Sequence, residues 1–94
     1  MTEQRTPCCP ILARGVRYRW DELRQQHQLL FPEGMLVLNE TAAAIVRLCD
    51  GRSRDNLVAE LSRSFPNASI HMDLSELLDR LASRGLIDDA NNAS

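Results

Sequence analysis

The sequence has no lysine, few aromatic residues and no long run of apolar residues. All eleven basic residues in the 94-residue chain are arginines, and aromatic residues make up 4% of it. One explanation for the absence of lysine is genomic base composition, since arginine codons are GC-rich. The functional alternative is that planar guanidinium groups serve a protein or peptide interface. A membrane-spanning helix needs about 20 apolar residues in succession, so we expect none. The N-terminus also lacks the apolar core of a secretion signal, so we expect a cytoplasmic protein.

Cysteine, histidine and glycine are too few or too scattered to form the common chemical motifs. Cys8 and Cys9 are adjacent and could pair only through a strained ring, while Cys49 lies far away, so no disulfide framework is expected. His27 and His71, expected in solvated loops, complete no zinc-type spacing with the cysteines. The sequence also contains no glycine-rich phosphate loop and no nucleophile signature. We therefore expect no catalytic site and no metal site.

The composition is that of one small globular domain. Hydrophobic residues make up 44% of the chain and charged residues 26%, with a net charge of −2. This charge argues against broad, sequence-independent binding to nucleic acid, which depends on many phosphate contacts. The polar ends, residues 1–9 and 89–94, are predicted to be flexible tails, and residues 10–88 are predicted to form a single domain.

The first half of the domain has the pattern of strands. Val16, Tyr18 and Trp20 alternate with two arginines, which is typical of a half-buried strand. Two further apolar runs, residues 28–31 and 35–38, are separated by a Pro-Glu-Gly turn. This spacing predicts a hairpin.

The second half has the pattern of three helices. Asn39 and Ser53 are good N-caps for the first two, and Asp73 with Glu76 predicts a box-like cap for the third, which ends at Gly85. Three strands followed by three helices is an α+β arrangement, with the helices packed on one sheet face. The inward helix faces supply the expected core, which includes Ile45, Leu48, Leu57, Leu61, Leu78 and Leu81.

Two features favour binding over catalysis. Residues 35–38 are apolar on both alternating faces, so either the helices and the N-terminal segment cover both sides or a partner pairs with the strand. On the third helix, Leu77, Arg80, Leu81 and Arg84 form a mixed stripe at helical spacing. A solvated rim beside the core explains this stripe about as well as a binding groove does.

Two other functions remain as alternatives. A winged helix-turn-helix protein would place the N-terminal end of the third helix on DNA base edges. That end carries Asp73, Glu76 and Asp79, which would repel a polyanion. A small redox or metal-binding protein would need a reactive thiolate at Cys8 or Cys9, and no basic neighbour is present to lower its pKa.

Three segments together carry a family resemblance: LLFPEGMLVLN (residues 29–39), ETAAAIVRLCDG (residues 40–51) and DLSELLDRLASRGLI (residues 73–87). They resemble the PqqD family of pyrroloquinoline quinone (PQQ) biosynthesis. The PEG turn, the LN cap and the CDG stop have the order and spacing of that family, and the resemblance extends from Pro10 to Ile87. Leu74, where a β-branched residue would be more typical, is a mild departure.

The resemblance implies a non-catalytic peptide chaperone with a winged-helix-like fold and no cofactor. Such proteins bind the precursor peptide PqqA by strand addition and present it to PqqE, a radical S-adenosylmethionine enzyme. No nucleic acid or membrane partner is expected, and the chain is expected to be a monomer with a possible homodimer at high concentration. The implied peptide-binding residues lie on the third strand and the third helix: Met35, Leu36, Val37, Leu38, Leu77, Arg80, Leu81 and Arg84.

Overall fold

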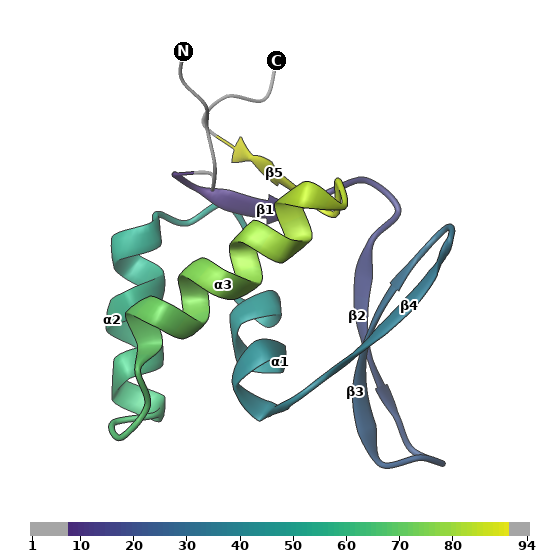
Figure 1. The fold of residues 1–94 in the computed structure, drawn as a ribbon, viewed down its shortest axis with the longest axis horizontal. Coiled ribbons are helices and arrows are strands. Elements are labelled where there is room, and N and C mark those ends of the chain that lie inside the picture. The colour runs from purple at the N-terminus through teal and green to yellow at the C-terminus, as the bar shows by residue number, and fades with distance from the viewer. Residues whose placement is uncertain (1–7, 91–94) are drawn as a thin grey trace.

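Two small antiparallel sheets and three helices make up the structure (Figure 1). It is a computed structural model, in which residues 8–90 are described. A sheet with the strand order β2-β3-β4 lies at one end, and helix α1 packs between this sheet and helix α3. In chain order the elements are β1 (Pro10–Leu12), β2 (Arg17–Asp21), β3 (Gln26–Phe31), β4 (Gly34–Leu38), α1 (Glu40–Arg47), α2 (Arg54–Ser64), α3 (Ile70–Ser83) and β5 (Ile87–Asp89).

The second sheet contains only β1 and β5, which pair antiparallel with Leu12 opposite Ile87. The α+β class is therefore confirmed, but the expectation that every strand precedes the helices is wrong. The described chain has five strands rather than three, and the last of them follows α3. β1 and β5 have three residues each, too few to show an alternating pattern, and they pair only when the ends of the domain meet. The winged-helix-like description stays a prediction.

Hydrogen bonds continue to both ends of the described chain. The backbone N–H groups of Cys8 and Cys9 each donate to the Asp89 carboxylate at 3.2 Å. The Ala90 N–H donates to the Cys9 carbonyl at 2.8 Å. Most of the predicted tails lie outside the described residues, and the domain boundaries stay a prediction.

The β2-β3-β4 sheet presents one face to the helices. Side chains alternate between the faces of a sheet, and residues paired across strands share a face. Leu29 lies between Tyr18 and Leu36 in the register, and Leu29 is completely buried. Leu38, at the end of β4, is also buried on this inner face. The opposite face, called the outer face below, carries the remaining side chains of β2 to β4.

The predicted caps of the first two helices are confirmed. The Asn39 side chain accepts a hydrogen bond from the Ala42 N–H at 2.7 Å, and α1 begins directly after it. The Ser53 hydroxyl accepts from the Asn56 N–H at 3.1 Å at the start of α2. Each bond satisfies a backbone donor that has no partner within the helix.

The predicted start of the third helix is wrong. α3 begins at Ile70, with Ser69 at the N-cap and no side-chain cap bond, so Asp73 and Glu76 lie inside the helix. The physical reason is burial. Ile70 is 4% exposed, and it extends the apolar stripe of α3 by one turn toward the N-terminus. Burying this side chain outweighs the local preference of Asp73 for a cap position.

The core lies between the inner face of the sheet and the three helices. The predicted core is confirmed for its most buried members, whereas Leu48, the C-cap residue of α1, is only partly buried. The buried apolar residues are Leu29, Leu38, Ala43, Ile45, Val46, Cys49, Leu57, Leu61, Ile70, Leu74, Leu77, Leu78, Leu81, Leu86 and Ile87.

Neither histidine lies in a loop, so that expectation is wrong. His27 is in β3, and its side chain is 19% exposed. The Tyr18 hydroxyl and His27 Nδ1 are 2.7 Å apart, and the Trp20 ring packs against the imidazole at 4.9 Å between centroids. These aromatic neighbours shield His27 from solvent. His71 is exposed, as expected, but lies in the first turn of α3.

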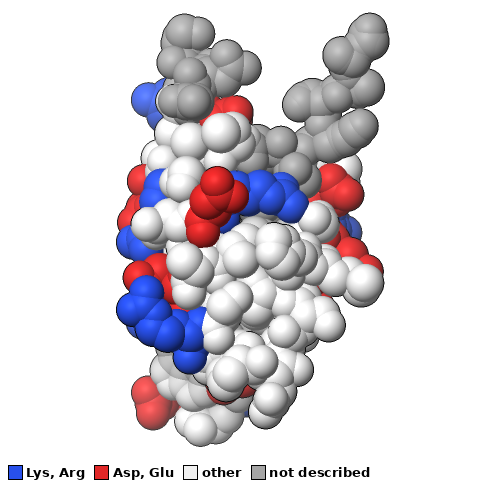
Figure 2. All heavy atoms as spheres, turned by 90° about the vertical axis from the view of Figure 1, so that its left-hand side faces the viewer, with Lys and Arg blue, Asp and Glu red and all other residues white. Residues whose placement is uncertain are grey.

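The face over α2 carries charges of both signs. Figure 2 shows blue and red side chains close together along one side and near the top, and an uncharged area across the lower centre and right. Binding to a nucleic-acid backbone requires a broad area of positive charge. No such area covers the part of this face that the structure describes. No described helix is long and apolar enough to cross a bilayer.

Candidate functional site

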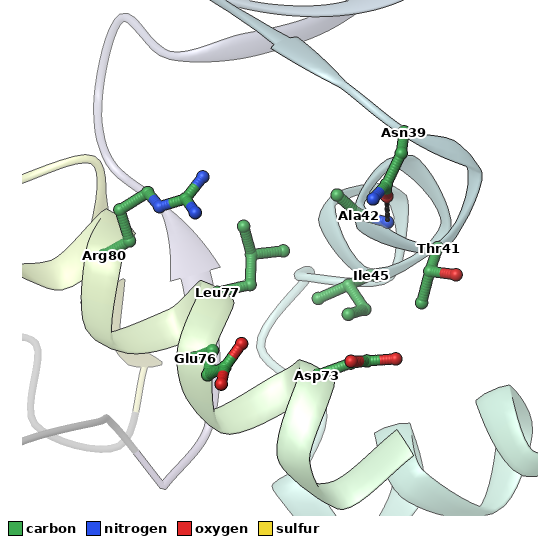
Figure 3. Close-up of a pocket in the computed structure, with 8 residues that line it drawn as sticks. All are labelled: Asn39, Thr41, Ala42, Ile45, Asp73, Glu76, Leu77 and Arg80. Carbon is green, nitrogen blue, oxygen red and sulfur yellow. Dashed lines mark hydrogen bonds between the residues drawn. The ribbon is translucent and has the colours of Figure 1, made fainter. Parts of the chain in front are cut away.

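A hollow of about 160 Å³ lies between α1 and α3, directly after the end of β4 (Figure 3). Its apolar side chains come from both helices, and its polar groups surround them. The start of α1 contributes Asn39, Thr41, Ala42 and Ile45, and α3 contributes Asp73, Glu76, Leu77 and Arg80.

The size of the hollow bears on what it can hold. Pockets for small molecules and cofactors typically have volumes of roughly 300–1,000 Å³. At about 160 Å³ this hollow is smaller, and it opens to solvent. It suits one side chain of a larger ligand better than a whole cofactor.

The charged groups of the hollow are arranged with opposite signs at opposite ends. In Figure 3 Arg80 reaches over one end, the Asp73 carboxylate lies at the other end, and Leu77 and Ile45 lie between them. Glu76 is four residues before Arg80, a spacing that permits a salt bridge. Within residues 8–90, however, none of these three charged side chains forms an ion pair. A ligand in the hollow therefore meets unpaired charges of both signs.

The β4 strand leaves one edge of its sheet open. Among residues 8–90, β3 is the one strand that pairs with β4. A two-residue loop joins these strands, with Phe31 opposite Gly34, and such a loop is closed by a hydrogen-bonded pair. Hydrogen-bonded and non-bonded pairs then alternate along an antiparallel ladder. Leu36 therefore bonds to β3, whereas the backbone groups of Met35 and Val37 point away from β3, toward the open edge.

The structure brings only some of the predicted site residues to the hollow. Leu77 and Arg80 line it, and Leu38 immediately precedes Asn39 at its rim. Leu81 is 0% exposed and belongs to the core beneath α3. Arg84 is exposed in the C-cap of the same helix, outside the hollow.

The predicted β4 residues divide between the two faces of the sheet. Leu36 and Leu38 are on the inner face, and Leu38 is buried. Met35 is 43% exposed and Val37 58% exposed, and both lie on the outer face. Their side chains cannot reach the hollow, whereas their backbone groups lie on the edge that leads to it.

Several residues of the hollow are not evident as binding residues from the sequence alone. The sequence pattern of Asn39 indicates only a helix cap, and that of Asp73 and Glu76 indicates a cap and a source of repulsion. A usable signal was present, because Asp73, Leu77 and Arg80 are spaced i, i+4, i+7 and share one helix face. No local pattern could reveal Thr41, whose place at the hollow depends on how α1 packs against α3.

Two of the three cysteines have raised pKa values. A hydrogen bond with the Cys8 sulfur, together with desolvation, raises the pKa of the Cys9 thiol. Burial raises the pKa of Cys49 to about 12. Both shifts reduce the thiolate fraction at neutral pH, and the thiolate is the reactive and metal-binding form. In the described chain no three His, Cys, Asp or Glu side chains gather as metal ligands would.

Comparison with known proteins gives a consistent result. The model of a family described as Coenzyme PQQ synthesis protein D (PqqD) matches residues 26–87. A PqqA binding protein of Methylococcus capsulatus is 41% identical over 73 residues, which cover 77% of this chain and 78% of that protein. A PqqA binding protein of Azotobacter vinelandii is 40% identical over 90 residues, which cover 94% of this chain and 98% of that one.

A solved structure shares the fold. It is the solution NMR structure of the PqqD truncation of Methylobacterium extorquens PqqCD, described as a functional, stand-alone recognition element for ribosomally synthesized and post-translationally modified peptides. It is 34% identical to this chain, with a TM-score of 0.71, and the match covers 84% of this chain and 87% of that one.

Proposed function

The chain belongs to the PqqD family, and from this premise we propose that it binds the precursor peptide PqqA as a peptide chaperone in PQQ biosynthesis. Its relatives are named for binding PqqA, and the similar solved structure is described as a peptide recognition element. The observation that carries the proposal is the open edge of β4, which leads directly to the hollow between α1 and α3.

The peptide binds by adding a strand to β4. Met35 and Val37 each offer a backbone N–H and C=O to it, and these bonds do not depend on the side chains of either partner. The peptide residue opposite Leu36 then projects toward the inner face, where the helices lie. Selection between peptides comes from that side, from the apolar surface of Leu77 and from the charges around it.

The charges of α3 suit a peptide that carries both signs. Arg80, with Arg84 one turn further along, attracts an acidic peptide group, and Asp73 with Glu76 attracts a basic one. The described chain leaves these groups without ion pairs, so binding breaks none. Exposed charge pairs mainly set orientation and association rate.

The role is non-catalytic, and it ends with delivery of the peptide to PqqE. The raised pKa values of Cys9 and Cys49 disfavour a thiolate nucleophile at either residue, which supports assigning the chemistry to the partner enzyme. The peptide is made by ribosomes, so the encounter takes place in the cytoplasm. The exposed edge of β4 also supports a monomer that forms a homodimer only at high concentration.

The experiment is a calorimetric titration of PqqA into the protein, combined with amide chemical-shift mapping. Saturable binding is expected, with the largest shifts at Met35, Val37 and the residues of the hollow. A PqqA peptide with the same composition in scrambled order is the control. Absence of binding, or shifts confined to α2, would refute the proposal.

A further inference from the structure

The outer face of the β2-β3-β4 sheet has an organised pattern of side chains. Residues paired in register share a face, so the outer face consists of rows that cross the three strands. Each row has an arginine on β2 and an exposed apolar residue on β4. The two rows are Arg17–Leu30–Met35 and Arg19–Gln28–Val37.

The apolar end of these rows is unusual for a solvent-facing surface. Met35 is 43% exposed and Val37 58% exposed, and they are neighbours two residues apart on one strand. Leu30, beside Met35, is partly exposed. Single exposed apolar residues are common, whereas a contiguous group of them next to arginines is typical of a protein interface, where methionine and arginine are both enriched.

The charged end of the rows is available to a partner. Arg17 and Arg19 are exposed, and neither forms an ion pair with any described residue. By contrast, Gln28 in the middle is 4% exposed, and its Nε2 donates to the Asp21 carboxylate at 2.9 Å. The polar group at the centre of the surface is thus already satisfied. A complementary partner needs an apolar patch bordered on one side by acidic residues.

We propose that this outer face is the docking surface for the enzyme that modifies the bound peptide, and that the enzyme meets it with an apolar patch and an acidic border. The inference rests on the proposed function, because a peptide strand added at β4 extends the same rows by one residue each. Peptide residues opposite Met35 and Val37 point to the outer face, and the residue opposite Leu36 points to the inner face. An enzyme docked on the outer face therefore contacts the chaperone and every second side chain of its peptide.

The position of β2 allows peptide binding and enzyme docking to be separated. Adjacent strands are roughly 4.8 Å apart, so Arg17 lies two strand spacings, about 10 Å, from the β4 edge. Changing it does not touch the backbone groups that hold the peptide. Met35 is nearer, but Met35→Gln keeps the backbone, the length and the neutrality of the side chain.

The experiment measures two affinities for each variant, one for PqqA and one for PqqE. Arg17→Glu is expected to bind PqqA within about twofold of the parent, and both Arg17→Glu and Met35→Gln are expected to bind PqqE at least tenfold more weakly. The loss in Arg17→Glu should shrink at high salt because exposed charges are screened. The matched controls are Met72→Gln on α3, where Met72 is 61% exposed, and Arg63→Glu on α2. Both controls should keep parental affinity for both partners.

The two ideas fail in different ways. If the parent does not bind PqqA, the proposed function is wrong. If PqqA binds but PqqE binds the parent and both variants equally, the docking surface is wrong and peptide binding stands. Sedimentation of the parent provides a further test, since a dimer that Met35→Gln abolishes would show that the outer face contacts a second copy of the chain, which overturns the inference.

Discussion

Replacing Val37 by proline tests strand addition most directly. Proline removes the backbone N–H, and at this position that group points toward the open edge rather than toward β3. The side chain is 58% exposed, so its replacement removes little buried surface. The domain is therefore expected to keep its fold, since proline is tolerated on edge strands.

The size of the effect follows from one missing donor. A peptide carbonyl that faces Val37 would lose its partner, and an unsatisfied buried acceptor costs about 1–3 kcal/mol. This corresponds to a loss of PqqA affinity of roughly 5- to 150-fold, since about 1.4 kcal/mol is a factor of ten. Calorimetric titration measures this loss, and a thermal melt of the variant confirms that it is folded.

Two further variants make the result interpretable. Val37→Thr keeps the N–H and nearly the same shape, so it should bind PqqA like the parent. Leu36→Pro removes a donor that bonds to β3, so it should lower the stability of the fold itself. A folded Val37→Pro that binds PqqA with parental affinity would refute the assignment of this edge as the peptide site.

Three other changes test the structure more widely. Leu78→Ala removes a side chain that is 0% exposed and should cost about 2–5 kcal/mol in a denaturant melt; a loss below about 0.5 kcal/mol would contradict its place in the core. Combined Arg80→Glu and Arg84→Glu should weaken PqqA binding at low salt and less at high salt, whereas a loss independent of salt would argue against charge pairing. The raised pKa of Cys49, about 12, means that its contribution to stability is complete below the thiol's ordinary pKa of 9.0 and falls as the pH rises from there toward 12. The free energy of unfolding measured in urea melts should therefore be lower at pH 10 than at pH 8, and Cys49→Ala should reduce this difference. An equal difference in that variant would assign the loss of stability to other groups.

The interior of the helices was largely predictable from the sequence. The caps Asn39 and Ser53 act locally, through a bond to a backbone group three residues away, so no distant part of the chain is needed to place them. The apolar spacing of α3 likewise predicted Leu78 and Leu81 in the core. The start of α3 was not predictable by the same reasoning, because the burial of Ile70 depends on a neighbour that only the folded chain supplies.

The candidate site was predictable in part. The sequence indicated that residues 35–38 and the stripe with Leu77 and Arg80 were surfaces for binding. It did not indicate that Asn39 and Thr41 from α1 line the same hollow as Arg80. Helical spacing identifies a face of a helix, but the angle at which two helices pack decides which part of that face stays exposed.

By itself the sequence determined the α+β class, two of the helix starts and most of the apolar core, because these follow from periodicity and from bonds between residues close in the chain. Tertiary structure alone decided the pairing of β1 with β5, the contact of His27 with Tyr18, and the two faces of β4. Each of these depends on contacts between segments far apart in sequence or on the register between strands. A shift of one residue in that register would exchange the inner and outer faces of β4, and no local pattern in an all-apolar strand fixes it.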